Sequence, residues 1–320
     1  MLENKQYNYL STYLIVSISF LFALIIGSGL YGYGHDFYEA YYQPNLTWGG
    51  IFDQLGYRVA TLTIYGVHIG VHLVTFILSI SAGFLIREHI KFKQSYSLIL
   101  FLSLYILAIH TWPIIMSTSN AMRQGLAMSL IFMALIASSR KNFYWMILFS
   151  VLSIFMHKTG LLFFLIIIFS TVINYYNVSL SYKSKVFINF FVGLILLFSS
   201  YYALNLIGFI FSEESRIIGA DFRWAFVSIG FIYITSSIFY PNILSNSFNL
   251  TLYYFSFISL SFYISGLNWQ YERMGMMMLI PYILSFGILL NRSSYKIYLI
   301  LTFVGLLWLT ILTGMYGSLK

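Results

Sequence analysis

The stretch STSNAMRQGLAMSLIFMALIASSRKNFYWMILFSVLSIFMHKTG, residues 117–160, decides the fold of this chain. It holds two apolar runs, which are separated by the basic pair Arg140-Lys141. The first run opens with Arg123 and Gln124 behind a polar lead-in, and the second ends at His157. A helix of about 20 apolar residues crosses a hydrocarbon core, so the stretch predicts a helical hairpin in a membrane. Two crossings return the chain to its starting side, so we expect Arg123 and His157 at the same membrane face.

The composition is that of a polytopic membrane protein. Of the 320 residues, 60% are hydrophobic and 8% are charged, whereas soluble proteins carry about 25% charged residues. Backbone polar groups must be satisfied internally in lipid, so we expect an all-α fold. The chain has no cysteine, which excludes disulfides and Cys-ligated metal sites. The first apolar run is expected to remain as a transmembrane helix, and residues 1–320 are expected to form one transmembrane domain.

Eleven apolar runs are interpreted as membrane crossings. We expect helices near 10–30, 59–86, 95–116, 121–138, 142–157, 160–176, 186–208, 225–240, 250–266, 274–290 and 297–316. An odd number of crossings puts the two chain ends on opposite sides of the membrane.

The basic residues segregate to one side of this arrangement. With the N-terminus in the cytoplasm, the inner loops hold ten basic and two acidic residues, a net charge of +8. The outer loops hold seven of each and are neutral. The positive-inside rule therefore predicts a cytoplasmic N-terminus and an outer C-terminus. The excess charge thus indicates topology and not nucleic-acid binding, and the mixed acids, arginines and aromatics of the outer loops place function on the outer side.

The first outer loop, residues 31–58, is rich in aromatic residues. A short interfacial helix is predicted within it at residues 35–43, because glycines precede this segment and a proline follows it. One interpretation is an aromatic belt with solvated acids at the membrane surface. The other is a platform on which sugar rings stack against Tyr38 and Tyr41, with Asp36 as a general base.

Arg123 opens the fourth predicted crossing. Ser119 or Asn120 is expected to cap that helix, and the helix dipole is positive at its N-terminus. Arg123 adds a full positive charge there, so the site favours an anion such as phosphate, with Gln124 and Asn120 as polar neighbours. The alternative is an arginine that snorkels to lipid headgroups.

The histidines differ in what they offer. His157, at the end of the fifth predicted crossing, is suited to act as acid, base or hydrogen-bond donor to a phosphate. His68 and His72 have the i,i+4 spacing that suits zinc on a helix, but no HExxH motif or nearby carboxylate accompanies them. We therefore expect a polar pair in the bundle interior and no metal site.

The start of the tenth predicted crossing repeats the arrangement at Arg123. The segment LNWQYERMGMMML, residues 267–279, brings Trp269, Glu272 and Arg273 together. Two arginines at two outer helix starts would clamp the two phosphates of a lipid pyrophosphate, while Glu272 is a third candidate base. Three further polar residues of the outer loops are candidates for sugar binding: Arg58, Asp221 and Arg223. The alternative for Asp221 and Arg223 is a salt bridge to each other.

Three motifs together resemble the EpsG-like branch of the Wzy-type polysaccharide polymerases. They are Gly34-His35-Asp36 with the tyrosines that follow, Met122-Arg123-Gln124-Gly125-Leu126-Ala127, and Phe155-Met156-His157. Arg273 at a late helix start also fits, and the resemblance covers residues 30–290. His35 departs from the family's pattern before the aspartate.

The resemblance implies a multi-pass glycosyltransferase of the bacterial inner (plasma) membrane with GT-C-like architecture and no metal or other cofactor. Such enzymes polymerise undecaprenyl-pyrophosphate-linked oligosaccharide repeat units on the outer face, giving O-antigen of lipopolysaccharide or exopolysaccharide. A chain-length regulator and a flippase are the protein partners it implies. The base would be Asp36, His157 or Glu272, in an inverting displacement.

Other functions use a similar substrate or fold. A different polyprenyl-linked glycosyltransferase or an O-antigen ligase needs the same pyrophosphate clamp, but ligases usually carry a large late outer loop, and the longest outer loop here is the first. A flippase or transporter for lipid-linked sugars would show internal repeats and charges near the bilayer midplane. An O-acyltransferase would take an acyl donor from the cytoplasmic side, where the loops offer little beyond lysines.

Overall fold

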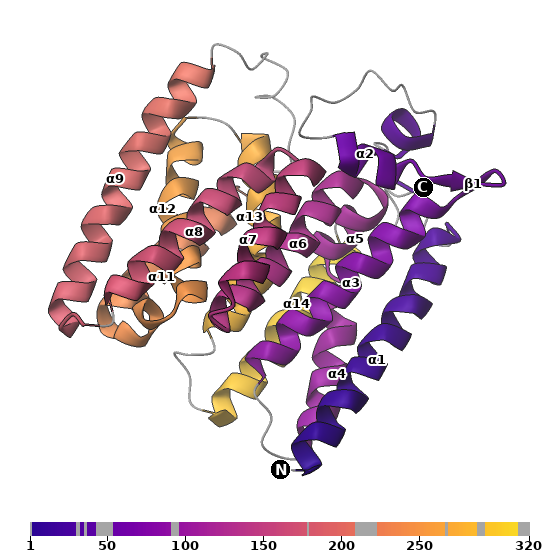
Figure 1. Cartoon of the computed structure of the whole chain (residues 1–320), viewed down its shortest axis with the longest axis horizontal. Helices are drawn as coiled ribbons and strands as arrows, with labels where there is room; N and C mark the ends of the chain where they lie inside the picture. Colours follow the sequence, from indigo (N-terminus) through magenta and orange to yellow (C-terminus); the bar gives the residue numbers. More distant parts are fainter. Residues whose placement is uncertain are drawn as a thin grey trace. The chain divides into compact units, whose positions relative to one another are not determined.

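The structure is a computed structural model, and it describes residues 2–29, 33–34, 37–42, 54–90, 96–177, 179–208, 223–265, 268–286 and 292–312. The described residues are helical apart from turns and one two-stranded hairpin (Figure 1). The chain divides into two compact units, one formed by Met1–Phe164 with Arg292–Lys320 and the other by Leu165–Asn291. Each unit has its own set of packed helices.

The first unit is built around the hairpin of residues 117–160. Its elements are α1 (Leu2–Gly27), the π-helix η1 (Phe37–Tyr42), α2 (Gln54–Ala60), β1 (Thr63–Ile64), β2 (Val67–His68), α3 (Ile69–His89), α4 (Tyr96–Ile109), α5 (Trp112–Ser119), α6 (Met122–Ser139), α7 (Phe143–Met156) and α14 (Arg292–Leu312). α1 packs along α3, and α6 packs on both α3 and α7 (Figure 1). Because 14 of the 18 residues of α6 are buried, α6 is the core helix of this unit.

The second unit is held together by α12, whose residues are buried on nearly every face. Its elements follow α8 (Thr159–Asn177): α9 (Tyr182–Gly208), α11 (Arg223–Phe239), η2 (Pro241–Ser245), α12 (Ser247–Ile264) and α13 (Asn268–Phe286). Tyr233 and Ser285 hydrogen bond at 2.5 Å, and Ser285 donates to Asn249 Oδ1 at 2.7 Å. Buried polar groups are costly when unpaired, so these bonds specify how α11, α12 and α13 pack.

A proline bends the third predicted crossing into two helices. α4 and α5 meet at an angle of 53°, with Pro113 in the first turn of α5. Proline lacks an N–H and clashes with the preceding turn, so one helix cannot continue through it. The backbone N–H of Trp112 donates instead to Thr310 Oγ1 of α14 at 2.8 Å. α14 therefore accepts a hydrogen bond from a buried backbone N–H at the bend between α4 and α5.

The second predicted crossing is wrong over its first ten residues. Residues 59–68 hold the end of α2 and the β1–β2 hairpin, and α3 starts at Ile69. Tyr65 and Gly66 form the two-residue turn with φ values of 50° and 79°. Two successive residues with positive φ fit a type I′ turn, the connection that matches the twist of a hairpin. The Tyr65-Gly66 turn therefore interrupts a run of residues that is apolar enough to be predicted as a helix.

The fold class is an all-α membrane protein. Six of the described helices are long and apolar enough to cross a membrane, and the bent α4–α5 pair makes a seventh. Helices also occupy the other predicted ranges, but α7, α11 and the apolar part of α13 are shorter. The count of eleven crossings and the orientation therefore stay predictions.

Charged side chains join the end of α3 to α1 and to the residue that follows α6. Arg87 Nη1 donates to Thr12 Oγ1 at 2.6 Å, and Arg140 pairs with Glu88 at 2.6 Å. Arg140 follows Arg123 by 17 residues of nearly continuous helix, a rise of about 25 Å. Arg123 therefore lies at the opposite end of α6 from these charge contacts.

Candidate functional site

The short helix α2 contacts both segments that carry the candidate residues Arg123 and His157. The guanidinium carbon of Arg123 lies 5.9 Å from the centre of the Tyr57 ring. A Cβ added to Gly56 would lie 2.1 Å from the carbonyl oxygen of Met156. α2 spans seven residues, about 10 Å. The start of α6 and the end of α7 therefore lie at the same end of the first unit, on either side of one short helix.

Arg123 is held over an aromatic cluster. Its distance to the Tyr57 ring falls within the roughly 6 Å range of a cation–π contact. Tyr57 in turn lies 6.1 Å from Tyr41 between ring centres, and each tyrosine is 3% exposed. Arg123 itself is partly exposed. The Tyr57 ring therefore contacts the Arg123 guanidinium, and part of the Arg123 side chain stays accessible.

Close packing between α5 and α6 positions Arg123. A Cβ on Gly125 would lie 2.0 Å from the carbonyl oxygen of Ser117, so only glycine allows this approach without a backbone shift. The N-cap of α6 is Ala121, and no side chain makes a capping hydrogen bond there. The prediction of Ser119 or Asn120 as the cap is therefore wrong. Asn120 occupies the turn between the two helices, and α5 includes Ser119 as its last residue.

The first outer loop docks against this same turn. The Gly34 N–H donates to the carbonyl oxygen of Ser119 at 3.2 Å, and a Cβ on Gly34 would lie 2.4 Å from Asn120 Cβ. His35 and Asp36 lie outside the described residues. They follow Gly34 directly, and Phe37 donates its N–H back to the Gly34 carbonyl at 2.9 Å. The loop carrying the candidate base is therefore anchored beside the start of α6.

An aromatic group on η1 secures the loop further. Tyr33 stacks on Phe37 with ring centres 4.3 Å apart and donates its hydroxyl to the Gly27 carbonyl at 2.7 Å. Burial, with a smaller contribution from Tyr38, raises the pKa of Tyr33 above its ordinary value, so this hydroxyl stays protonated and donates. Tyr38 is 51% exposed. Of the two tyrosines predicted to bind sugar, Tyr38 offers an accessible ring and Tyr41 packs inside the protein.

His157 is buried in the turn between α7 and α8. It is 4% exposed, and its Nδ1 lies 2.8 Å from Thr159 Oγ1 and 3.3 Å from the Thr159 backbone nitrogen. A backbone N–H can only donate, so Nδ1 is the accepting nitrogen. In the neutral ring the proton then lies on Nε2. The turn thus fixes the histidine in a tautomer whose Nε2 is a donor.

The other candidates of the first unit lie on the same elements. Gln124 is fully buried on α6, and Asn120 is partly exposed. Arg58 is exposed on α2, next to Tyr57. Gln124 and Asn120 are near Arg123 in the chain, and their role in an anion site stays a prediction, as does the role of Arg58 in sugar binding.

The remaining candidates belong to the second unit. α13 begins at Asn268, so Arg273 lies in its second turn, and the prediction that it opens a helix is wrong. Arg273 is partly buried. Trp269 and Glu272 are on α13, and Arg223 is the first residue of α11. The side chains of these three and all of Asp221 lie outside the described residues. A pyrophosphate clamp from Arg123 and Arg273 stays a prediction.

The two histidines with zinc-like spacing do not share a helix. His68 ends β2, with its ring 5.1 Å from Tyr42, and its carbonyl lies 3.2 Å from His72 Nδ1. His72 lies on α3, and a Cβ on Gly27 would meet its ring at 2.3 Å. The pair therefore joins α1, η1 and the hairpin. Within the described part of the chain, no group of three or more metal-ligating side chains gathers.

Sequence reasoning missed Tyr57 and Thr159 as parts of this site. Both contacts are tertiary or turn-specific, and the only local signals were the Gly56-Tyr57 pair and the His-Lys-Thr-Gly turn. A glycine before an aromatic residue suits a helix that must approach another backbone closely.

No family model, curated protein or solved structure matches the chain.

Proposed function

We propose that this chain polymerises undecaprenyl-pyrophosphate-linked oligosaccharide repeat units into surface polysaccharide on the outer face of the bacterial inner membrane. One observation carries the proposal: α2 contacts both Arg123 and the residue before His157. Arg-Gln-x-Leu-Ala and Phe-x-His are the motifs that resemble the Wzy-type polymerases. Their juxtaposition supports a shared site, and the resemblance supplies the substrate class.

In this reaction the leaving group is a lipid pyrophosphate. The acceptor sugar's hydroxyl oxygen bonds to the anomeric carbon of the growing chain while the bond from that carbon to the pyrophosphate oxygen breaks. Negative charge therefore develops on the phosphate oxygens, and a preorganised cation stabilises it most in a site shielded from water. Arg123 suits this role because its planar fork binds two phosphate oxygens at once. Gln124 and Asn120 are the polar neighbours of that phosphate.

The acceptor hydroxyl must lose a proton as the new bond forms. We assign the base to Asp36, because the Nδ1 lone pair of His157 is already used by the Thr159 N–H. His157 then serves as a hydrogen-bond donor to the pyrophosphate through Nε2, and Asp36 accepts the proton. The displacement is inverting, since a single base and no nucleophile are invoked.

The remaining roles follow the same chemistry. Arg273 is the second phosphate ligand, Glu272 an alternative base, and Tyr38, Trp269, Arg58, Asp221 and Arg223 are the sugar contacts. Eleven crossings with a cytoplasmic N-terminus belong to the proposal, because the net charge of +8 then falls on the inner side. Tyr41 is predicted from the sequence to bind sugar as well, but it is only 3% exposed, so we assign it to supporting the Tyr57 ring.

The experiment is the profile of lipid-linked glycans in a strain that lacks this chain, with a plasmid-borne copy as the control. The proposal predicts that single repeat units on the lipid carrier accumulate on the outer leaflet and that the plasmid restores the polymer. Full-length polymer left on the lipid carrier would instead mean a ligase. Units retained on the inner leaflet would mean a flippase, and either result would overturn the proposal.

A further inference from the structure

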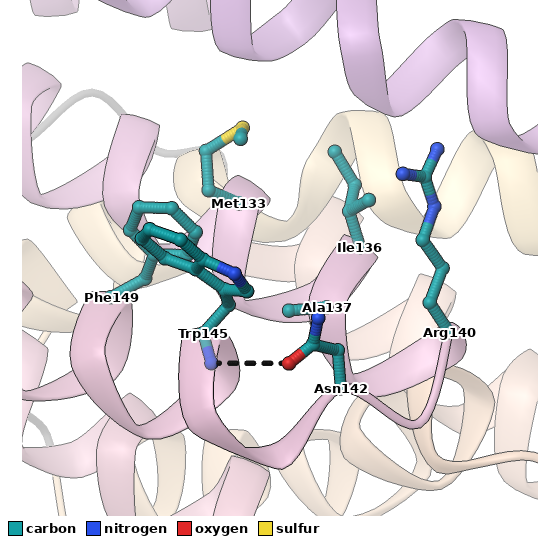
Figure 2. Close-up of a pocket in the computed structure, with 7 residues that line it drawn as sticks. All are labelled: Met133, Ile136, Ala137, Arg140, Asn142, Trp145 and Phe149. Atoms are coloured by element: carbon teal, nitrogen blue, oxygen red, sulfur yellow. Dashed lines mark hydrogen bonds between the residues drawn. The ribbon is translucent and has the colours of Figure 1, made fainter.

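A pocket lies between α6 and α7 at the end remote from Arg123 (Figure 2). Its volume is about 260 Å³. Figure 2 shows Arg140 on one side of it and Met133, Trp145 and Phe149 on the other, with Asn142 between. Met133 precedes Arg140 by seven residues on α6, about 10 Å along the helix. The lining therefore passes from cationic to apolar over two helical turns.

The cationic side of the pocket has capacity for an anion. Glu88 Oε2 accepts from Nε and Nη2 of Arg140 at 3.1 and 2.6 Å. The two hydrogens on Nη1 are outside that pair, and the Arg140 side chain is 53% exposed. Lys141 is the next residue and is also exposed. The pocket lining thus includes one cation beside a single carboxylate, and a second, exposed cation follows it directly in the chain.

The apolar side of the pocket belongs to a membrane-spanning segment. α6 is long and apolar enough to cross a membrane and ends at Ser139, directly before Arg140. Trp145, 46% exposed, stacks on Phe149 with ring centres 5.5 Å apart. Exposed tryptophan marks the level of lipid headgroups. Arg140 therefore lies at headgroup level, and Met133 and Phe149 lie toward the hydrocarbon.

We propose that this pocket binds one anionic phospholipid, with its phosphate at Arg140 and Lys141 and one acyl chain against Met133 and Phe149. Trp145 and Asn142 have side-chain N–H groups that can donate to the headgroup oxygens. Basic pockets between transmembrane helices suit anionic headgroups because the charge adds to the apolar contact. This site depends on the membrane fold alone and not on the proposed polymerase activity.

The test uses the purified full chain in mild detergent, titrated with phosphatidylglycerol or phosphatidylcholine of identical acyl chains and followed by native mass spectrometry. The wild-type chain is expected to bind the anionic lipid about fivefold more tightly than the zwitterionic one. Arg140→Gln should remove this preference. Ala137→Leu fills the pocket without touching the charges, and should weaken binding of both lipids while the chain remains monodisperse.

Two variants outside the pocket serve as controls. Tyr144→Ala removes an exposed aromatic side chain next to Trp145, and Lys183→Gln removes an exposed basic residue on α9. Both should bind phosphatidylglycerol like the wild-type chain. Equal affinity of the wild-type chain for the two lipids would overturn the proposal, as would an equal loss in Lys183→Gln. Displacement of the lipid by inorganic phosphate alone would show a free-anion site instead.

Discussion

The guanidinium carbon of Arg123 lies 5.9 Å from the centre of the Tyr57 ring, while the residue before Tyr57 touches the backbone of Met156. Two segments separated by a whole helical hairpin are thus joined through adjacent residues of α2. This relationship places Arg123 and the turn that holds His157 on either side of the same short helix.

Replacing Arg123 with lysine keeps the charge but removes the bidentate fork. If Arg123 holds a pyrophosphate, we expect Arg123→Lys to lower polymer synthesis by about 10- to 1,000-fold. The measurement is polymer length and amount in cells, at equal membrane levels of the protein. Arg87→Lys, at the far end of α3, is the matched control and should make normal polymer. Full-length polymer from Arg123→Lys would make a bidentate clamp at this residue untenable.

Tyr57 is expected to support Arg123 through its ring face. A cation–π contact is worth about 0.5–2 kcal/mol, so Tyr57→Leu should lower activity by about 2- to 30-fold. Tyr57→Phe keeps the ring and should lose less. Polymer yield from the two variants separates the ring from the hydroxyl. If the phenylalanine variant were as impaired as the leucine one, the ring face would not be the source of the effect.

The tautomer of His157 leads to a comparison between two amides. Glutamine places an N–H near the position of Nε2, whereas asparagine places its amide near Nδ1. Because we assign the donor to Nε2, His157→Gln should retain more activity than His157→Asn, by about tenfold if one charge-assisted hydrogen bond is kept. Thr159→Val, which removes Oγ1 but keeps the backbone N–H, should be mildly impaired. The reverse order of the two amides would show that the group at the Nδ1 position, and not a donor at Nε2, is required, and an equal and complete loss in both variants would argue for His157 as the base.

Two glycines test how the start of α6 is positioned. A Cβ on Gly125 would lie 2.0 Å from the Ser117 carbonyl, whereas a Cβ on Gly305 of α14 meets nothing within 4 Å. Gly125→Ala should destabilise the chain by about 1–3 kcal/mol, because the packed helices must separate. Gly305→Ala should be neutral or stabilising, since alanine is the better helix former. Thermal unfolding of both variants in one detergent measures this. Equal melting temperatures would contradict the close packing of α5 on α6.

Hydropathy alone located the helices well, because a crossing must be apolar along its whole length. The hairpin at Tyr65-Gly66 was not predicted, since its flanking residues are as apolar as a helix. The bend before α5 follows from Pro113, yet its stabilising partner Thr310 lies 198 residues away. Local periodicity in a sequence predicts helices, but it carries no information on contacts between residues so far apart in the chain.

The candidate site shows the same division. The lengths of two apolar runs predicted Arg123 and His157 on one side, and the start of α6 and the end of α7 do lie at the same end of the first unit. The sequence could not predict Tyr57 beneath Arg123, which depends on Gly56 meeting the Met156 carbonyl. The capping prediction failed because Ala121 occupies the N-cap, so packing against α5 fixes this helix start in place of a side-chain cap.

The most direct measurement is glycan polymerisation by the purified chain in liposomes that contain undecaprenyl-pyrophosphate-linked repeat units. The proposed function predicts a ladder of products that grow by one repeat at a time, with release of undecaprenyl pyrophosphate, and no ladder from Arg123→Lys. Unchanged substrate with the folded wild-type chain, or an equal ladder from Arg123→Lys, would contradict the account.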